Sequence, residues 1–142
     1  MEAANARIGV AIVTRDRADE LLATLERLLA LPERPPIVVV DNGSSDGTVR
    51  RVRAAFPQVA FPQIQFPQVP FPQVQIVPLA RNLGGAGRTV GVRRLPTPYV
   101  AFSDDDSWWA PGALERAADL LDRHGRLGLV AAAVLVGPQE RL

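Results

Sequence analysis

Short runs of apolar, mostly β-branched residues recur along this chain of 142 residues, and segments with helical spacing lie between them. Runs of this kind, without apolar–polar alternation, are typical of strands that are buried on both faces. The runs that predict strands cover residues 8–13, 37–40, 74–77, 98–103 and 127–136. Strands that alternate with helices indicate an α/β fold with a mostly parallel sheet and flanking helices. We therefore expect a single domain over residues 1–142.

The intervening segments carry recognisable helix signals. Helices are expected around residues 21–29, over 48–55, from the glycine-rich segment 82–88 to about Arg94, and from Pro111 to Gly125. Asp16 is placed to cap the first of these helices, and Pro111 is placed as the first residue of the last one. Leu114, Ala118 and Leu121 would form the apolar face of that last helix.

A tandem repeat of five residues occupies residues 56–75, in the form FPQVA, FPQIQ, FPQVP and FPQVQ. A period of five matches neither a helix nor a strand, and each proline removes a backbone hydrogen-bond donor. We interpret the repeat as a looping insertion, in which one pentad would make a normal connection and the other three exceed what the fold needs. Four exposed phenylalanines would form an interaction surface, which leaves open a different function, that of a non-catalytic interaction module that docks through the repeat.

The composition excludes several classes of site and partner. The chain has no cysteine and a single histidine, His124, which excludes disulfides, thiolate nucleophiles and multi-histidine metal centres. The formal net charge of +1 provides no overall field that would favour nucleic acid. We find no transmembrane segment and no signal peptide, so we expect a cytoplasmic protein.

Polar clusters follow three of the predicted strands, at residues 14–17, 41–44 and 104–106. In open α/β sheets, ligands bind beyond the carboxyl ends of the strands. The contrast between these clusters and the apolar strands before them therefore predicts one shared binding site.

The third cluster consists of three adjacent aspartates, Asp104, Asp105 and Asp106. Adjacent carboxylates repel one another, and in an extended chain the middle one points away from the outer two. Hard oxygen ligands suit Mg²⁺ or Mn²⁺, usually shared with the phosphates of a substrate. The alternative is a solvated acidic turn that caps the helix at Pro111.

Other residues of these segments are candidates with weaker signals. Asp41 could accept hydrogen bonds from a base or a ribose, although a turn residue is the simpler reading. Arg88, at the start of a helix, could meet a diphosphate or could lie in solvent. We expect one of Trp108 and Trp109 to pack in the core. The glycines near Arg88 do not match a dinucleotide-binding fingerprint.

Four blocks of the sequence together resemble family 2 glycosyltransferases, which have a GT-A fold. The blocks are VAIVTRDR at 10–17, VVVDNGSSDGT at 38–48, RNLGGAGRTVG at 81–91 and YVAFSDDDSWWAPGAL at 99–114. The resemblance covers residues 8–136 apart from the repeat. It implies a GT-A-like, Rossmann-like sheet across whose strand ends a nucleotide-sugar binds.

The resemblance also implies roles for single residues. Thr14 and Arg17 would line the nucleotide pocket and Asp41 would contact the base. Asp104 would lie near the ribose and the metal, and Asp106 would hold Mn²⁺ or Mg²⁺ on the diphosphate. The remaining residues expected at the nucleotide-sugar site are Asn42, Arg88 and Asp105. The implied reaction transfers the sugar to the hydroxyl of a sugar, polysaccharide or lipid-linked acceptor, with inversion.

One departure from the family pattern concerns the catalytic base, which the family places after the fifth strand. None of Glu115, Asp119, Asp122 and Glu140 matches the base motif. We therefore expect a donor-binding half, truncated after the fifth strand, that binds donor and transfers poorly on its own. A nucleotidyltransferase is a further alternative, which Arg15 and Arg17 leave open because such enzymes hold a triphosphate with basic residues.

Overall fold

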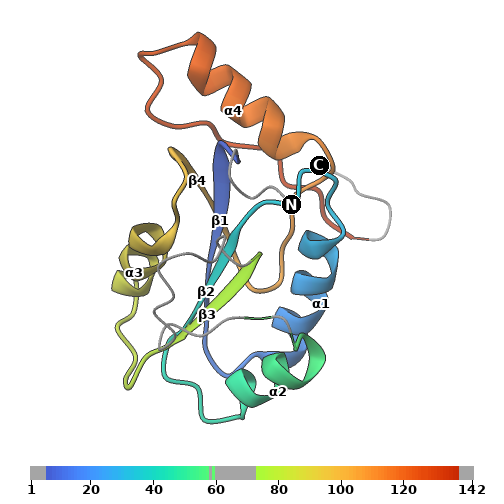
Figure 1. Ribbon diagram of the computed structural model, residues 1–142, viewed down its shortest axis with the longest axis vertical. Coiled ribbons are helices and arrows are strands. Elements are labelled where there is room, and N and C mark those ends of the chain that lie inside the picture. The colour runs from blue at the N-terminus through green and yellow to red at the C-terminus, as the bar shows by residue number, and fades with distance from the viewer. Residues whose placement is uncertain (1–5, 58, 60–72, 138–142) are drawn as a thin grey trace.

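The structure is a computed structural model that describes residues 6–57, 59 and 73–137. Within these residues the elements follow one another as strand and helix in strict alternation (Figure 1). The elements are β1 (Ile8–Thr14), α1 (Ala18–Leu29), β2 (Ile37–Asp41), α2 (Thr48–Ala55), β3 (Val74–Pro78), α3 (Ala86–Arg94), β4 (Tyr99–Ser103) and α4 (Ala113–Arg123). The first four strand predictions and the four helix predictions are confirmed, with boundaries that differ by a few residues.

The strands form one sheet in the order β3-β2-β1-β4, and every neighbouring pair is parallel. Thr14 lies opposite Asp41, and Asp41 lies opposite Pro78, so the strands end together at one edge of the sheet. This arrangement confirms the predicted α/β class with a parallel sheet and flanking helices.

The two faces of the sheet pack against different helices (Figure 1). One face buries alternate strand residues such as Val10 and Ile12 against Leu21 and Leu25 of α1, and Leu114 of α4 joins the same core. The other face buries Val38, Val40 and Val77 with Val90 of α3 packed against them. Both faces are therefore covered, which explains why the strand sequences are apolar throughout rather than alternating.

Helix α3 lies unusually close to the sheet because its inward residues are glycines. Gly87 and Gly91 are its buried residues. A Cβ atom on Gly91 would lie 3.3 Å from Cβ of Ala11, tighter than an ordinary van der Waals contact. The absence of a side chain there lets the helix backbone rest on β1 and β2.

The predicted fifth strand at residues 127–136 is wrong in this structure. Residues 127–135 are in no strand, Val136 makes only a single β-bridge, and the segment is not one of the four strands of the sheet. It is mostly exposed, with 79% exposure at Leu129 and 74% at Val134. An apolar run becomes a strand only where a neighbouring strand takes its hydrogen bonds. The segment does not pair with β4, whose outer edge has no partner among the described residues.

The start of α4 also differs from the sequence prediction. The helix begins at Ala113, and Gly112 occupies the N-cap position with a φ of 80°, so Pro111 lies outside the helix. Leu114 and Ala118 are buried as predicted, and Leu121 is partly buried. In the described part of the chain, no helix has the length and apolarity that crossing a membrane requires.

The two ends of the pentad repeat belong to the core. Val59, from the first pentad, is buried, and Phe56 packs against the same cluster. Val74, from the last pentad, is a buried residue of β3. The middle of the repeat, residues 60–72, lies outside the described residues. The prediction that a partner docks through the repeat therefore stays a prediction.

Candidate functional site

The carboxyl ends of β1, β2 and β4 bring the three predicted polar clusters to one place. We call this place the carboxyl edge, and it consists of residues 14–17, 41–46 and 104–107. The backbone N–H of Asn42 donates to the carbonyl of Thr14 at 2.8 Å, which joins the first two clusters. The side chain of Arg17 joins the first cluster to the third through Asp105 and Asp106. The three polar clusters therefore lie together at the carboxyl ends of the strands, as the sequence predicts.

Asp105 points into the protein and holds the edge together. Its carboxylate accepts a hydrogen bond from the Thr14 hydroxyl at 2.8 Å and pairs with Nε of Arg17 at 3.1 Å. Its carbonyl accepts from the Thr24 hydroxyl at 2.8 Å. Burial raises the pKa of the Asp105 carboxyl, and the Thr14 hydrogen bond and the Arg17 charge oppose that rise.

The outer aspartates are exposed and Asp105 is buried, as predicted, but the chain is not extended there. Asp105 and Asp106 lie in a turn in which the Ser107 N–H donates to the Asp104 carbonyl at 3.3 Å. Asp106 pairs with the Arg17 guanidinium at 2.8 Å, and Asp104 lies 3.3 Å from the guanidinium of Arg88 on α3. The side chain that reaches the start of α4 is Glu33, which accepts from the Gly112 N–H at 2.6 Å. No side chain caps the first turn of α4, so the aspartates do not have the capping role that the alternative gave them.

The outer aspartates suit a metal that is shared with a ligand, and not a metal held by protein alone. Among the described residues, no group of three or more histidine, aspartate or glutamate side chains is arranged to hold an ion. A divalent cation shared with phosphates takes only one or two protein carboxylates. Asp104 and Asp106 are both exposed at the carboxyl edge, so they are the carboxylates there that could take part in such a shared site.

Asp41 ends β2 as a buried carboxylate, with 3% of its surface exposed. The Ser44 hydroxyl donates a hydrogen bond to its Oδ1. Burial raises the pKa of Asp41, while the hydrogen bonds from Ser44 oppose that rise. Gly43 lies between Asp41 and Ser44 with a φ of 75°, a conformation that favours glycine, and a Cβ there would lie 3.0 Å from the carbonyl carbon of Arg81. The turn thus folds Ser44 back over the end of its own strand.

Asn42 ties the glycine-rich segment to the carboxyl edge. Its Oδ1 accepts from the Leu83 N–H at 2.7 Å, and its Nδ2 donates to the Gly84 carbonyl at 3.1 Å. The side chain is buried and both of its polar atoms are used. The hydrogen bonds position the start of α3, and with it Arg88.

The prediction that Asp16 caps the first helix is wrong, and Asp46, which joins the same two loops, was not identified from the sequence. Asp16 does not cap α1. Its Oδ1 accepts from the Ser45 and Asp46 N–H groups at 2.6 and 3.2 Å. The carboxylate of Asp46 accepts from the Ala18 N–H at the start of α1 at 3.3 Å and from the Thr48 N–H at 2.9 Å. The signal available in the sequence was two loops that each carry an aspartate, but nothing indicated that each would bond the other loop.

The tryptophans that follow the aspartates divide as predicted. Trp109 packs against the core cluster. Trp108 is 48% exposed, and the guanidinium carbon of Arg27 lies 4.1 Å from its ring centre, a cation–π contact.

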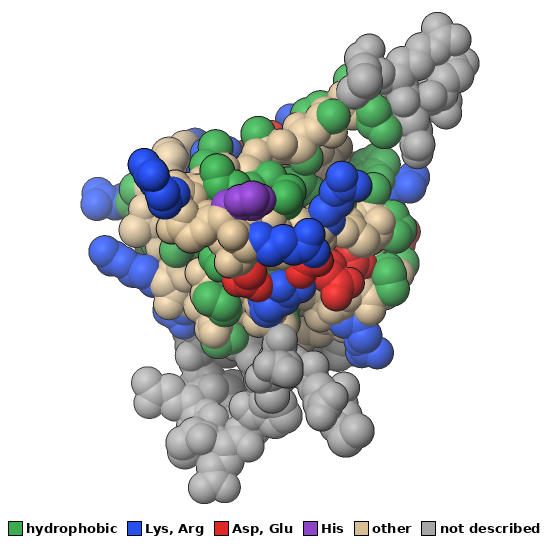
Figure 2. Space-filling model, turned by 90° about the horizontal axis from the view of Figure 1, so that it is seen from above, with side chains coloured by type: hydrophobic (Ala, Val, Ile, Leu, Met, Phe, Trp, Pro, Cys, Tyr) green, Lys and Arg blue, Asp and Glu red, His purple; other side chains and the backbone are tan. Residues whose placement is uncertain are grey.

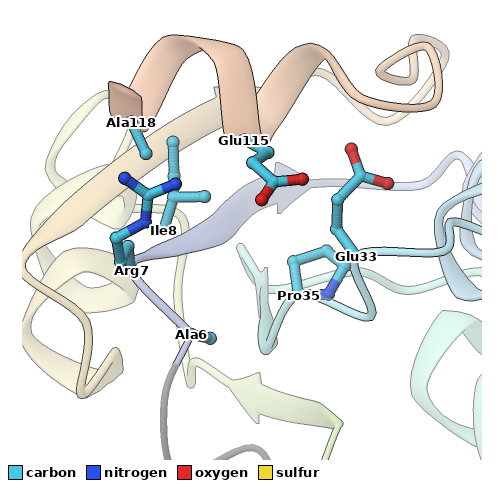
Figure 3. A pocket seen from close by; sticks show the side chains of 7 residues that line it. All are labelled: Ala6, Arg7, Ile8, Glu33, Pro35, Glu115 and Ala118. Atoms are coloured by element: carbon cyan, nitrogen blue, oxygen red, sulfur yellow. The ribbon is translucent and has the colours of Figure 1, made fainter. Parts of the chain in front are cut away.

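A cavity of about 170 Å³ lies at the opposite end of the sheet, where β1 begins (Figure 3). Arg7, Glu33 and Glu115 are among the residues that line it. Arg7 is paired with Asp119 and Asp122 of α4 at 2.8 and 2.6 Å. On the end of the molecule that carries α4, basic, acidic and apolar side chains are intermixed (Figure 2). This end holds none of the predicted site residues.

Solved structures that resemble this chain share its fold. The mannosyltransferase PcManGT from Pyrobaculum calidifontis, solved with GDP-Man and Mn²⁺, is 23% identical with a TM-score of 0.65. S. aureus TarS 1-349 is 22% identical with a TM-score of 0.61. The structure of TarS 1-349 in complex with UDP is 24% identical to this chain, with a TM-score of 0.55. Each match covers 84% of this chain and 33% of the other, so the chain spans about a third of their length.

The likeness to these structures confirms the GT-A-like, Rossmann-like fold. No curated protein matches the sequence. The model of the family described as glycosyl transferase family 2 matches residues 9–141. Since that match extends over most of the sequence, the chain belongs to glycosyltransferase family 2.

Proposed function

We propose that the chain binds a nucleoside diphosphate sugar at the carboxyl edge together with Mn²⁺ or Mg²⁺. The sugar is then transferred to an acceptor hydroxyl with inversion at the anomeric carbon. The observation that carries the proposal is the convergence of two arginines and two exposed carboxylates at this edge, through the pairs Arg17–Asp106 and Arg88–Asp104. Ligands of open α/β sheets bind at this edge.

Asp41 and its surroundings suit the nucleoside part of the donor. An ionised carboxylate only accepts hydrogen bonds, so it suits an N–H group of a base or a ribose hydroxyl. The Thr14 hydroxyl and the Asp105 carboxylate bond each other beneath the surface, and in this proposal they hold the loops around the nucleotide. Asn42 does the same for the segment that leads to Arg88.

The outer aspartates and the arginines suit the diphosphate. Asp104 and Asp106 would hold the divalent ion, which when bound supplies positive charge to the leaving diphosphate. Arg17 and Arg88 present guanidinium groups, which match phosphate oxygens in geometry and charge. In the structure, these arginines pair with the outer aspartates. We expect the pairs to open when the diphosphate binds.

The acceptor side of the reaction is a proposal for the whole enzyme. The acceptor would be a sugar, a polysaccharide or a lipid-linked hydroxyl, and a carboxylate base would take its proton. We assign that base to no residue of this chain.

Thermal unfolding tests the proposal directly. The full chain is heated with Mn²⁺ and each of UDP, GDP, CDP and ADP, for the wild type and for Asp106→Ala. A ligand at 100 times its Kd stabilises by about 2.7 kcal/mol, which raises the Tm by roughly 5–10 °C for a domain of this size. We expect such a rise to depend on the metal and to be lost in Asp106→Ala.

A matched control distinguishes the loss of a carboxylate at the site from the loss of a carboxylate elsewhere on the surface. Asp19 pairs with Arg51 on the surface of α1 and lies outside the carboxyl edge. Asp19→Ala should therefore keep the full Tm rise. A cooperative melt that no nucleotide shifts in the wild type would overturn the proposed function.

A further inference from the structure

The loops after β1 and β2 are joined by two independent connections that both start at Asp16. Its backbone N–H donates to Oγ of Ser44 at 2.9 Å. Its Oδ1 accepts from the backbone N–H groups of Ser45 and Asp46, and from the Ser45 hydroxyl at 3.2 Å. A single residue therefore fixes three consecutive positions of the second loop.

The first connection fixes the direction of the Ser44 hydroxyl. A serine hydroxyl has one proton to donate and lone pairs that accept. Because Oγ of Ser44 accepts from Asp16, its proton is directed to Oδ1 of Asp41. A line of hydrogen bonds thus runs from Asp16 through Ser44 to the buried carboxylate that ends β2.

The backbone of Asp16 is adapted to this role. Its φ of 52° is in the left-handed region, which among residues with a side chain suits aspartate and asparagine best. Asp16 is exposed, so the conformation is not forced on it by burial. The left-handed turn is what allows both its N–H and its carboxylate to face the loop after β2.

We propose that Asp16 is a positioning residue for base recognition, which holds Asp41 as an acceptor-only group through Ser44. The inference rests on the proposed nucleotide site. Held in this state, Asp41 suits a base with an N–H on its pairing-edge ring nitrogen, as in uracil and guanine. It disfavours cytosine and adenine, which present an unprotonated ring nitrogen there. The chain should therefore select UDP over CDP, or GDP over ADP.

The test measures the Kd of UDP, CDP, GDP, ADP and inorganic pyrophosphate, each with Mn²⁺, for the full chain and its variants. Pyrophosphate has no base, so it reports on the diphosphate part of the site alone. Asp16→Gly removes the carboxylate that holds the backbone N–H groups of Ser45 and Asp46, while glycine tolerates the positive φ and keeps the backbone N–H that donates to Ser44. Without the carboxylate, the loop that carries Ser44 is no longer held against that N–H. Asp16→Asn keeps an acceptor oxygen and tolerates the same backbone conformation.

We expect the wild type to prefer the N–H base of a matched pair by about tenfold or more, the effect of one hydrogen bond of about 1.4 kcal/mol. Asp16→Gly should lose most of this preference while its Kd for pyrophosphate stays the same. Asp16→Asn should retain it, and so should the control Asp19→Asn. Ser44→Ala, which leaves Asp16 intact, should lose the preference as Asp16→Gly does.

The possible failures point to different errors. An unchanged preference in Asp16→Gly overturns the inference, whatever Ser44→Ala does, and leaves the proposed function standing. Equal losses for pyrophosphate and for every nucleotide also overturn it, because they indicate a general structural role. A wild type that binds none of the five probes overturns the proposed function and this inference together.

Discussion

The hydroxyl of Thr14, the last residue of β1, donates a 2.8 Å hydrogen bond to the carboxylate of Asp105, which follows β4. Both residues are buried, with 2% and 7% exposure. The middle aspartate of the triplet is thereby used by the fold itself, and Asp104 and Asp106 are left facing outward. The contact explains how three consecutive residues of one kind can have two different roles.

Truncation of Asp105 should destabilise the protein. Asp105→Ala leaves the buried Thr14 hydroxyl without its partner, which costs about 1–3 kcal/mol. Urea denaturation measures the change in the free energy of unfolding. The double variant Thr14→Val/Asp105→Ala should cost less than the sum of the single variants, because the two residues share one bond. Asp104→Ala is the matched control and should change stability by less than about 0.5 kcal/mol.

Removal of Arg88 should affect binding and spare stability. Its pairing with Asp104 is on the surface, and such pairs contribute at most about 0.5 kcal/mol after screening. If Arg88 meets the diphosphate, Arg88→Ala should weaken pyrophosphate binding about tenfold, as expected for one charge-assisted hydrogen bond. Isothermal titration calorimetry measures the Kd. Arg93→Ala, an exposed arginine at the other end of α3, should bind as the wild type does.

The Asp41 carboxyl should make the free energy of unfolding larger at acidic pH than at neutral pH. Burial raises its pKa in the folded state above the ordinary 3.8, so the folded protein holds this proton more tightly than the unfolded chain. Its contribution to the free energy of unfolding is therefore most favourable in acid and declines as pH rises through the folded pKa.

The comparison of wild type with Asp41→Asn isolates that contribution, since other carboxyl groups are common to both proteins. The wild type should gain stability relative to Asp41→Asn as the pH is lowered from 7 to 4. A constant difference over this range would contradict the raised pKa. Urea denaturation at each pH provides the measurement.

The segment 127–136 should tolerate substitution as a surface does. Leu129 is 79% exposed, so Leu129→Ala should change the free energy of unfolding by less than about 0.5 kcal/mol. The fully buried Leu25 provides the contrast, with an expected loss of about 2–5 kcal/mol for Leu25→Ala. A comparable loss at Leu129 would mean that the segment is packed in solution as a strand.

The elements that could be predicted from the sequence are those whose signal is local. Buried parallel strands such as Val38–Val40 carry their own apolar signature, and the carboxyl ends of parallel strands meet by geometry alone. The apolar run from Leu127 to Val136 has the same signature. It fails as a strand because strand formation depends on a neighbour, which composition does not specify.

The site was predicted in its location and less fully in its internal contacts. Asp41 and Asp104 were identified because each directly follows a strand. Asp16 and Asp46 were not, because each bonds to the backbone of a loop about 30 residues away. Such contacts depend on how the loops after β1 and β2 are positioned relative to each other. Neither hydrophobic periodicity nor a sequence motif specifies that position.

The two buried glycines of α3 affect the position of the Arg88 guanidinium. A Cβ on Gly87 would lie 3.2 Å from a methyl group of Val13, so no side chain acts as a spacer between this helix and the strands. Arg88 is the next residue, and its distance from Asp104 is therefore set by direct contact of backbone with strand atoms. A larger residue at position 87 or 91 would push α3 away from the sheet and move the Arg88 guanidinium away from Asp104. Two glycines without side chains thus determine how closely the Arg88 guanidinium can approach Asp104.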